Sequence, residues 1–326
     1  MPLELVIGFT LLFQFANGWT DAPNAVATVV STRVLRPYPA VLMAAVLNLV
    51  GALVTGTAVA KTISEGIVAP GAVSLETIAA AVLAAALWAM AAQAFGMPSS
   101  ETHALVASLL GAGFAAGGFG ALEWSGTSKV VYSLFTSPFI AFAGGFLLMV
   151  LIYRIFRRAR PRTVRRIFGR GQVLSAAFMA FSHGSNDGQK GMGIIALALF
   201  LNGNLRELEI PLWVMFACAT TIGIGTAVGG WRVIRTIGLR MTKLEPVNGF
   251  AAETSAALLI VGASRFGIPI STTHAIGSAI IGVGATRRLS AVRWGVAREV
   301  VGTWILTWPG CMLLGYLLGL VFQGIF

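Results

Sequence analysis

The chain contains two pairs of repeated strings, and both pairs place polar residues inside apolar sequence. The first pair is FANGWTDAPN at 15–24 and FSHGSNDGQK at 181–190, which aligns Asp21 with Asp187. The second pair is GMPSSETHA at 96–104 and GIPISTTHA at 267–275, almost the same distance apart as the first. The chain is therefore a duplication. Hydrophobic segments interrupted by polar residues at matching points of two halves are typical of secondary transporters.

The composition identifies a membrane protein. Of 326 residues, 56% are hydrophobic and 11% charged, and the mean hydropathy is +0.83, which excludes a soluble domain of this size. Uncharged stretches of about 20 residues or more, enough to cross a bilayer, are 38–60, 77–100, 102–122, 130–153, 210–231, 266–286 and 300–326. Isolated charges interrupt three more: 5–32, 171–205 and 246–264. The sequence predicts an all-α polytopic membrane protein with about ten hydrophobic segments.

The net charge of +11 indicates a topology and not nucleic-acid binding, because the basic residues are clustered. Eighteen of the 23 Lys and Arg residues lie at Arg33 and Arg36, at eight Arg within 154–170, within 232–243 and within 287–298. Ten crossings with the N-terminus outside put every cluster on the cytoplasmic side.

Five crossings in each half give the halves opposite orientations, which predicts an inverted repeat. The first repeat covers 1–153 and the second 171–326, joined by an Arg-rich stretch at 154–170 that we interpret as a cytoplasmic linker loop. Whether 97–122 and 267–286 span the membrane or form re-entrant hairpins stays open.

Asp21 and Asp187 are the most informative residues, because an acid near a bilayer centre costs about 2.5 to 3.5 kcal/mol on insertion scales. Small or helix-breaking residues flank them: Gly18, Pro23, Gly184 and Gly188. Helix breaks there would free backbone carbonyls for a small cation. Side-chain carbonyl oxygens of the same type come from Asn17, Asn24 and Asn186. The alternative is that each acid forms an ion pair that holds helices together, which Lys190 favours in the second half.

The Pro-containing strings supply hydroxyls immediately before an uncharged helical segment: Ser99, Ser100, Thr102, Ser271, Thr272 and Thr273. A helix N-terminus carries unpaired N–H groups and the positive end of the helix dipole, so hydroxyls beside it can form an oxyanion site. Two such ends would hold a tetrahedral anion from both sides. The alternative is that these residues only cap their helices. His103 and His274 are more typical of hydrogen-bonded positioning residues than of metal ligands.

The two repeats are not chemically equal. Glu101 aligns with Thr272, and Lys190 aligns with Asn24, so we expect the asymmetry to orient the substrate and the coupling ion. Glu253 lies inside a predicted crossing and has no acidic counterpart in the first half. It is a candidate proton carrier or the partner of Lys190.

These four ordered motifs resemble the inorganic phosphate transporter (PiT) family, in its bacterial low-affinity phosphate permease branch, over nearly the whole chain. The resemblance implies a symporter, not an enzyme, that carries phosphate with a cation and needs no cofactor. It implies sodium-binding positions at Asp21, Asn24, Asn186 and Asp187. It implies phosphate-binding positions at Ser99, Ser100, Thr102, Ser271, Thr272 and Thr273, to which we add Lys190. Asn17 and Glu253 complete the set expected to couple the cation.

Two positions depart from the sodium-coupled members of that family. Thr20 precedes Asp21 where such members carry Asn, and Lys190 stands where the repeat places Asn. Because a fixed ammonium can replace a bound sodium, we favour proton coupling over sodium coupling. The bacterial branch also implies uptake of a neutral metal–phosphate, in which a divalent metal travels with the anion. A sulfate permease of the same family is the alternative substrate assignment.

Two other classes of protein are weaker matches. The string at 267–274 resembles the Pro-Ile-Ser-Ser motif of membrane polyprenyl-pyrophosphate phosphatases, but Ser264 and Arg265 do not complete the Ser-Arg-Ser-Gly loop of those enzymes. A passive anion channel is disfavoured by acids in the middle of an anion pathway. The expected partners are inorganic phosphate and the lipid bilayer of the bacterial cytoplasmic membrane, with no nucleic acid, and a homodimer stays open.

Overall fold

The computed structural model describes residues 1–240 and 244–325, which are almost entirely helical. The α-helices are α1 (Leu3–Ser31), α2 (Pro37–Val54), α3 (Ala58–Glu65), α4 (Leu75–Phe95), α5 (Glu101–Gly117), α6 (Trp124–Phe156), α7 (Pro161–Leu201), α8 (Leu212–Val228), α9 (Trp231–Arg235), α10 (Pro246–Arg265), α11 (Thr272–Ala285) and α12 (Trp294–Ile325). Short helical turns are η1 (Pro70–Ala72), η2 (Gly118–Ala121), η3 (Thr236–Arg240) and η4 (Leu289–Ala291). The predicted all-α class is confirmed.

The order of elements repeats. In each half, two long helices are followed by a short helix and a helical turn, then two helices, another turn and a final long helix. Thus α1 to α6 correspond in order to α7 to α12. The two halves also pack on each other through equivalent pairs of helices. Helix α1 packs on α8 and α2 packs on α7, and likewise α5 packs on α12 and α6 packs on α11.

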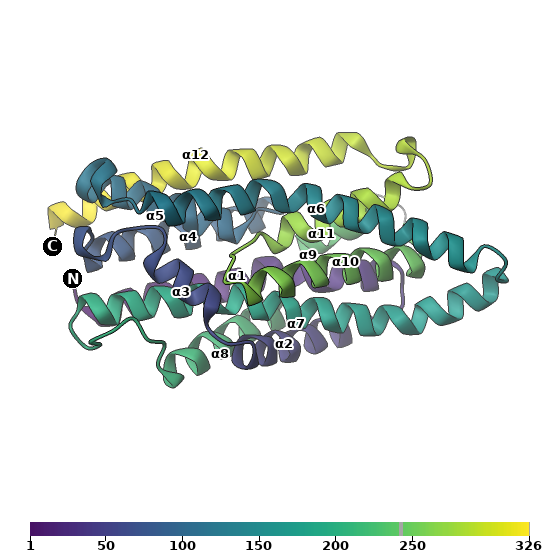
Figure 1. Ribbon diagram of the computed structural model, residues 1–326, viewed down its shortest axis with the longest axis horizontal. Coiled ribbons are helices and arrows are strands. Elements are labelled where there is room, and N and C mark those ends of the chain that lie inside the picture. The colour runs from purple at the N-terminus through teal and green to yellow at the C-terminus, as the bar shows by residue number, and fades with distance from the viewer. Residues whose placement is uncertain (241–243, 326) are drawn as a thin grey trace.

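Two helical hairpins bring their tips together in the middle of the molecule. Figure 1 shows α4 and α5 in the part nearer the chain ends, and α10 and α11 in the opposite part. The tips touch where the Thr102 hydroxyl donates to the carbonyl oxygen of Ile270 at 2.8 Å. Trp304 of α12 also donates to the Pro98 carbonyl at 3.1 Å. Residues far apart in sequence therefore meet at the centre of the protein.

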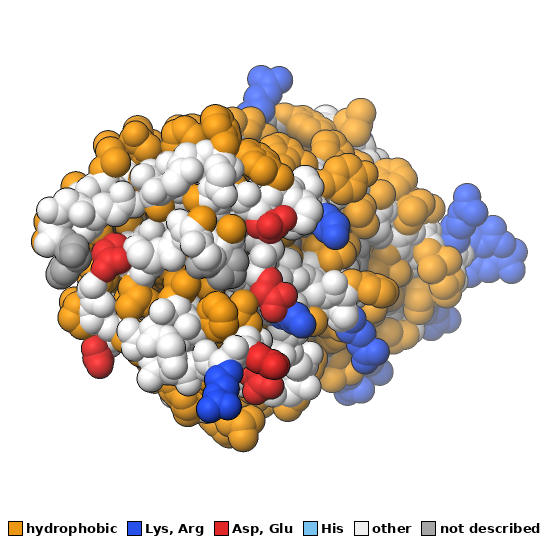
Figure 2. Space-filling model, turned by 60° about the vertical axis from the view of Figure 1, so that its left-hand side comes forward, with side chains coloured by type: hydrophobic (Ala, Val, Ile, Leu, Met, Phe, Trp, Pro, Cys, Tyr) orange, Lys and Arg blue, Asp and Glu red, His pale blue; other side chains and the backbone are white. Residues whose placement is uncertain are grey.

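The exterior is suited to lipid. Within the described residues, six helices are long and apolar enough to cross a membrane, and a seventh crossing is counted if α8 and the segment Trp231–Gly238, bent by 61°, form one span. The six are α2, α4, α5 extended to Ala121, α6, α10 and α12. Figure 2 shows hydrophobic side chains covering the flanks of the molecule. The protein is a multi-span membrane protein, and the count of about ten segments stays a prediction.

The helix breaks expected at the two acids are wrong. Both α1 and α7 run through their motifs without interruption, and Pro23 lies inside α1. The reason is close packing, which local sequence does not reveal. Gly230 packs against Pro23 and against the carbonyl oxygen of Trp19, which the missing N–H of Pro23 leaves free. Gly184 of α7 lies directly on the backbone of Asn48 in α2.

The Arg-rich stretch is also not a loop. Helix α6 continues to Phe156 and α7 begins at Pro161, so most of 154–170 is helical and only a short turn separates the two helices. Figure 1 shows this turn at the end of the molecule opposite both chain termini.

Glycines allow close packing of four pairs of helices, and each of these glycine contacts has a glycine on both helices. A Cβ at any of these glycines would overlap the backbone of the partner helix. The contacts are Gly18 with Ile222 and Gly225 with Phe15 (α1–α8), Gly51 with Phe181 and Gly184 with Asn48 (α2–α7), Gly111 with Met312 and Gly315 with Ser108 (α5–α12), and Gly145 with Ala279 and Gly282 with Phe142 (α6–α11). Small residues at helix interfaces allow this approach in membranes.

We expect Gly184→Ala to lower the free energy of unfolding by about 1 to 3 kcal/mol, because the added methyl group must displace the α2 backbone. Gly169→Ala is the matched control on the same helix, since nothing lies within 4 Å of a Cβ there. It should stabilise the protein by about 0.4 to 1 kcal/mol. Denaturant unfolding of both variants in detergent micelles checks this, and equal stabilities would contradict the close contact.

Candidate functional site

The two repeated acids meet at the centre of the protein. Asp21 of α1 and Asp187 of α7 are both buried, and His183 lies between them. The Nε2 atom of His183 is 3.6 Å from Oδ2 of Asp21 and 3.5 Å from Oδ2 of Asp187. The duplication therefore predicts correctly which acids come together.

Lys190 forms an ion pair with Asp187. Its Nζ atom lies 2.7 Å from Oδ2 of Asp187, one helical turn away on α7, and both side chains are fully buried. This is the alternative that the sequence left open for the second half. The alternative prediction, that Lys190 pairs with Glu253, is therefore wrong.

The tip of the second hairpin joins the acids. Thr273 donates to Oδ1 of Asp21 at 3.0 Å, and Thr272 donates to Oδ2 of Asp21 at 3.3 Å and to Oδ2 of Asp187 at 3.5 Å. Asn24 donates its amide to Thr273 at 2.9 Å and to Thr272 at 3.4 Å. Hydroxyls of α11, both acids and one predicted asparagine thus share one hydrogen-bond network.

The tip of the first hairpin carries an acid in place of a hydroxyl. Glu101 begins α5, as Thr272 begins α11, and its Oε1 atom accepts from Thr20 at 3.0 Å and from Ser99 at 3.2 Å. Glu101 is buried, and its Oε2 atom has no hydrogen-bond partner among the described residues. Thr20 and Glu101 were missing from the predicted site, although the mismatch between Glu101 and Thr272 was the signal.

The N-termini of α5 and α11 face each other. Ser100 and Ser271 cap these helices by accepting from the backbone N–H groups of His103 at 3.2 Å and His274 at 3.1 Å. The rings of the two histidines lie 4.4 Å apart, and Trp304 stacks on His274 at 3.9 Å. The capping alternative therefore holds for two of the six predicted hydroxyls. Ser99, Thr102, Thr272 and Thr273 instead bond to side chains or to the opposite tip.

Two predicted asparagines lie apart from the acids. Asn186 donates to Ser264 at 2.9 Å and accepts from the N–H of Ile270 at 3.4 Å, so it braces the second hairpin. Asn17, the repeat counterpart of His183, is buried with an amide that finds no hydrogen-bond partner in the described part of the chain.

The tautomer of His183 follows from its neighbours. Thr226 donates to the Ile222 carbonyl at 2.9 Å, so its oxygen accepts from the amide nitrogen of Asn48 at 2.7 Å. The amide oxygen of Asn48 then faces Nδ1 of His183 at 2.9 Å, which places the imidazole proton on Nδ1. The other ring nitrogen, Nε2, points between two carboxylates, whose negative charges attract a cation. Sequence reasoning gave His183 no role, although it lies one helical turn before Asp187.

The centre has the donor set of a cation site. Ligand atoms of Asp21, His183 and Asp187 lie within 4.8 Å of one another, and all three side chains are buried. Carboxylate oxygens are hard ligands that suit alkali and alkaline-earth cations, whereas imidazole nitrogen suits transition metals.

Glu253 belongs to a separate polar cluster. It is fully buried on α10 and accepts hydrogen bonds from Thr28, from Ser175 and, at 3.2 Å, from Gln172. No basic side chain pairs with it in the ion pairs of the described residues. Its role as a proton carrier stays a prediction.

Comparison with known proteins assigns the chain to a family. The sequence profile described as the phosphate transporter family matches residues 17–315. A protein of Rhizobium meliloti (strain 1021), named as a probable low-affinity inorganic phosphate transporter, is 45% identical over 313 residues, which cover 96% of this chain and 94% of that one. A protein of the same name from Bacillus subtilis (strain 168) is 43% identical over 326 residues, covering 99% and 97%.

A solved structure shares the fold. It is named as a sodium-dependent phosphate transporter, superimposes with a TM-score of 0.91 at 25% sequence identity, and matches 99% of both chains. All of these relatives are transporters and none is an enzyme, so the assignment to a phosphatase is excluded. The chain therefore belongs to the phosphate transporter (PiT) family, with its bacterial low-affinity members among its relatives.

Proposed function

We propose that the protein imports inorganic phosphate across the bacterial cytoplasmic membrane by symport with a cation, and that the cation is a proton. The names of the bacterial relatives support the substrate, and the candidate membrane-spanning helices support the location in a membrane. The paired hairpin tips support an anion site, since two helix N-termini meet there beside hydroxyl donors.

The proposed phosphate site lies between the tips, where Thr272 and Thr273 now donate to Asp21. A phosphate bound there would accept hydrogen bonds from the two threonine hydroxyls in place of Asp21. A cation near the carboxylates would offset the combined negative charge of the acids and the phosphate. The cation therefore binds first, near Asp21 and Asp187, and the phosphate follows.

The single observation that carries proton coupling is the ion pair between Lys190 and Asp187 at 2.7 Å. The ammonium already supplies a positive charge at Oδ2 of Asp187, a residue that the resemblance assigns to sodium binding. Protons are then the ions that can still load this centre. Two alternatives have support of their own: the structural relative is sodium-dependent, and the Asp21, His183 and Asp187 donors suit a divalent metal carried with phosphate.

An inverted repeat is the proposed basis of alternating access. It is supported by the exchange of partners between the halves, in which α1–α8 mirrors α7–α2 and α5–α12 mirrors α11–α6. Figure 1 also supports it, because α6 runs away from the chain ends whereas α12 runs back toward them.

The proposed orientation places both termini outside and the turn between α6 and α7 in the cytoplasm. It is supported by the charge distribution in Figure 2, where a group of Lys and Arg side chains lies at the far end, whereas the end that comes forward carries acidic side chains as well as basic ones.

Uptake of radiolabelled phosphate into proteoliposomes tests the proposal, with an inward proton gradient in one set, a sodium gradient in another and sulfate as competitor. We expect accumulation with the proton gradient alone. Strict dependence on sodium would return Asp187 to a sodium site, and transport of sulfate in place of phosphate would overturn the substrate assignment.

A further inference from the structure

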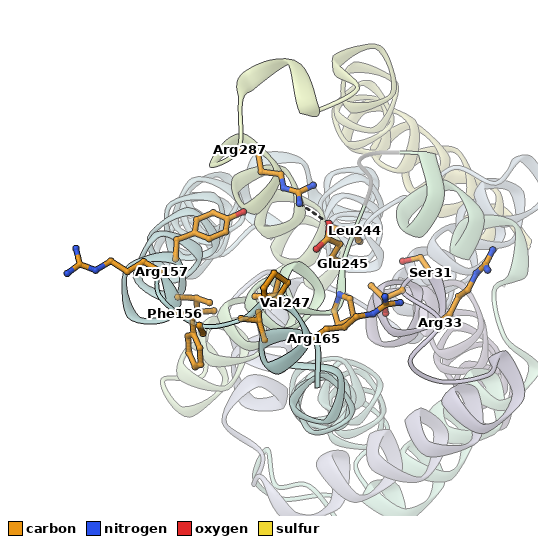
Figure 3. Close-up of a pocket in the computed structure, with 16 residues that line it drawn as sticks. Ser31, Arg33, Phe156, Arg157, Arg165, Leu244, Glu245, Val247 and Arg287 are labelled. Atoms are coloured by element: carbon orange, nitrogen blue, oxygen red, sulfur yellow. Dashed lines mark hydrogen bonds and ion pairs between the residues drawn. The ribbon is translucent and has the colours of Figure 1, made fainter. Parts of the chain in front are cut away.

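An arginine-lined cavity opens at the end of the molecule that holds the turn between α6 and α7. It has a volume of about 720 Å³ and lies among the end of α1, the end of α6, the start of α7 and the start of α10. Its polar lining includes Ser31, Thr32, Arg33, Arg157, Arg165 and Arg287. Figure 3 shows Arg165 reaching toward Ser31, with Arg33 at the same edge, while Arg287 pairs with Glu245. Three arginines of the lining thus have no carboxylate partner among the ion pairs of the described residues.

Arg33 occupies a backbone position that favours glycine. Among the described residues it is the one non-glycine with a positive φ, at 61°. The N–H of Arg33 donates to Val30 at 3.0 Å and that of Val34 donates to Val29 at 3.1 Å, which is the Schellman ending of a helix. Glycine is the usual residue at this point. An arginine therefore stands at a position that the backbone prefers to fill with glycine, and it lines the cavity.

Polar side chains extend from the cavity toward the central site, and several of them are joined by hydrogen bonds. Thr32 lines the cavity and donates to Gln172 at 2.8 Å, Gln172 donates to Glu253 at 3.2 Å, and Thr28 donates to the same carboxylate. Thr28 lies one turn of α1 after Asn24, which donates to Thr273 in the central site at 2.9 Å. Polar side chains therefore follow one face of α1 from the acids to the arginines.

We propose that this cavity is a second site, distinct from the central one, that binds a phosphate group. The guanidinium groups of Arg33 and Arg165 supply its donors, because arginine binds oxyanions through charge-assisted hydrogen bonds. The phosphate group is either free inorganic phosphate on its way out of the central site, which rests on the proposed function, or the headgroup of an anionic lipid. The chemistry of the site is the same for both.

Equilibrium binding of radiolabelled inorganic phosphate to the full chain in phosphatidylcholine nanodiscs tests the site. We compare the wild type with Arg33→Gly, which suits the backbone, with Arg165→Gln, and with Arg154→Gln as a matched control from the same stretch that does not line the cavity. For free phosphate we expect two sites per chain in the wild type and the control, and one in both cavity variants. The site lost should also be the one that added salt weakens most.

A second arm identifies a lipid source. In nanodiscs containing phosphatidylglycerol, a headgroup site would retain that lipid through delipidation in the wild type and the control but not in Arg33→Gly or Arg165→Gln. Equal phosphate stoichiometry together with equal lipid retention in all four proteins overturns the inference. A protein that keeps the Arg33-dependent site but accumulates no phosphate would contradict the proposed transport function and leave the cavity site standing.

Discussion

Asp187→Asn is expected to abolish phosphate uptake and to lower the free energy of unfolding by about 3 to 5 kcal/mol, because it leaves the buried ammonium of Lys190 without its carboxylate. Asp21→Asn should abolish uptake without this loss of stability. Asp21 has no lysine partner, and an asparagine oxygen still accepts from Thr273. Uptake in proteoliposomes and thermal unfolding in detergent measure the two effects separately.

The double variant Asp187→Asn/Lys190→Met is the control for this result. It removes both charges of the pair, so stability should return while uptake stays absent. Normal uptake by Asp187→Asn would remove that carboxylate from the mechanism. Equal stability of Asp187→Asn and the double variant would show that the unpaired ammonium of Lys190 is not the cause of the loss.

Lys190→Asn is expected to change the coupling ion from proton to sodium. The variant places at 190 the residue that its repeat counterpart, Asn24, already provides, and it removes the positive charge that now lies against Oδ2 of Asp187. Phosphate uptake should then require a sodium gradient, and a proton gradient alone should no longer drive accumulation.

Stability gives an independent measure of the same change. With the ammonium gone, sodium binding should stabilise the variant by about 2.7 kcal/mol when its concentration is 100 times the dissociation constant. The melting temperature of Lys190→Asn should therefore rise in sodium chloride relative to choline chloride at equal ionic strength, whereas that of the wild type should not. The same response in both proteins would contradict the assignment of Lys190 as a built-in cation.

The repeats made much of the centre predictable. Alignment of the halves singled out Asp21, Asp187 and the tip residues Thr272 and Thr273, and the structure brings these four side chains into one network. Composition was sufficient for the helical membrane fold, because hydrocarbon leaves a chain few ways to satisfy its backbone.

Other features depend on contacts that one chain segment cannot reveal. Asn186 points to the second hairpin and not to the acids because neighbouring residues on a helix face about 100° apart, so it cannot share the direction of Asp187. The proton on Nδ1 of His183 is set by Asn48, 135 residues away in sequence. The expected helix breaks at Pro23 and Gly184 failed for the same reason, since packing from other helices supports the backbone there.

The glycine contacts determine which helices can move independently of one another. Each glycine contact lies between one helix of the first half of the chain and one helix of the second half: α1 with α8, α2 with α7, α5 with α12 and α6 with α11. Backbones in direct contact leave little freedom to slide, so the sequence halves cannot rock against each other as two separate blocks. In the alternating access proposed above, each moving body would therefore contain helices of both halves. By the same logic, a chain cut in the turn between α6 and α7 would yield two fragments that reassemble through reciprocal surfaces.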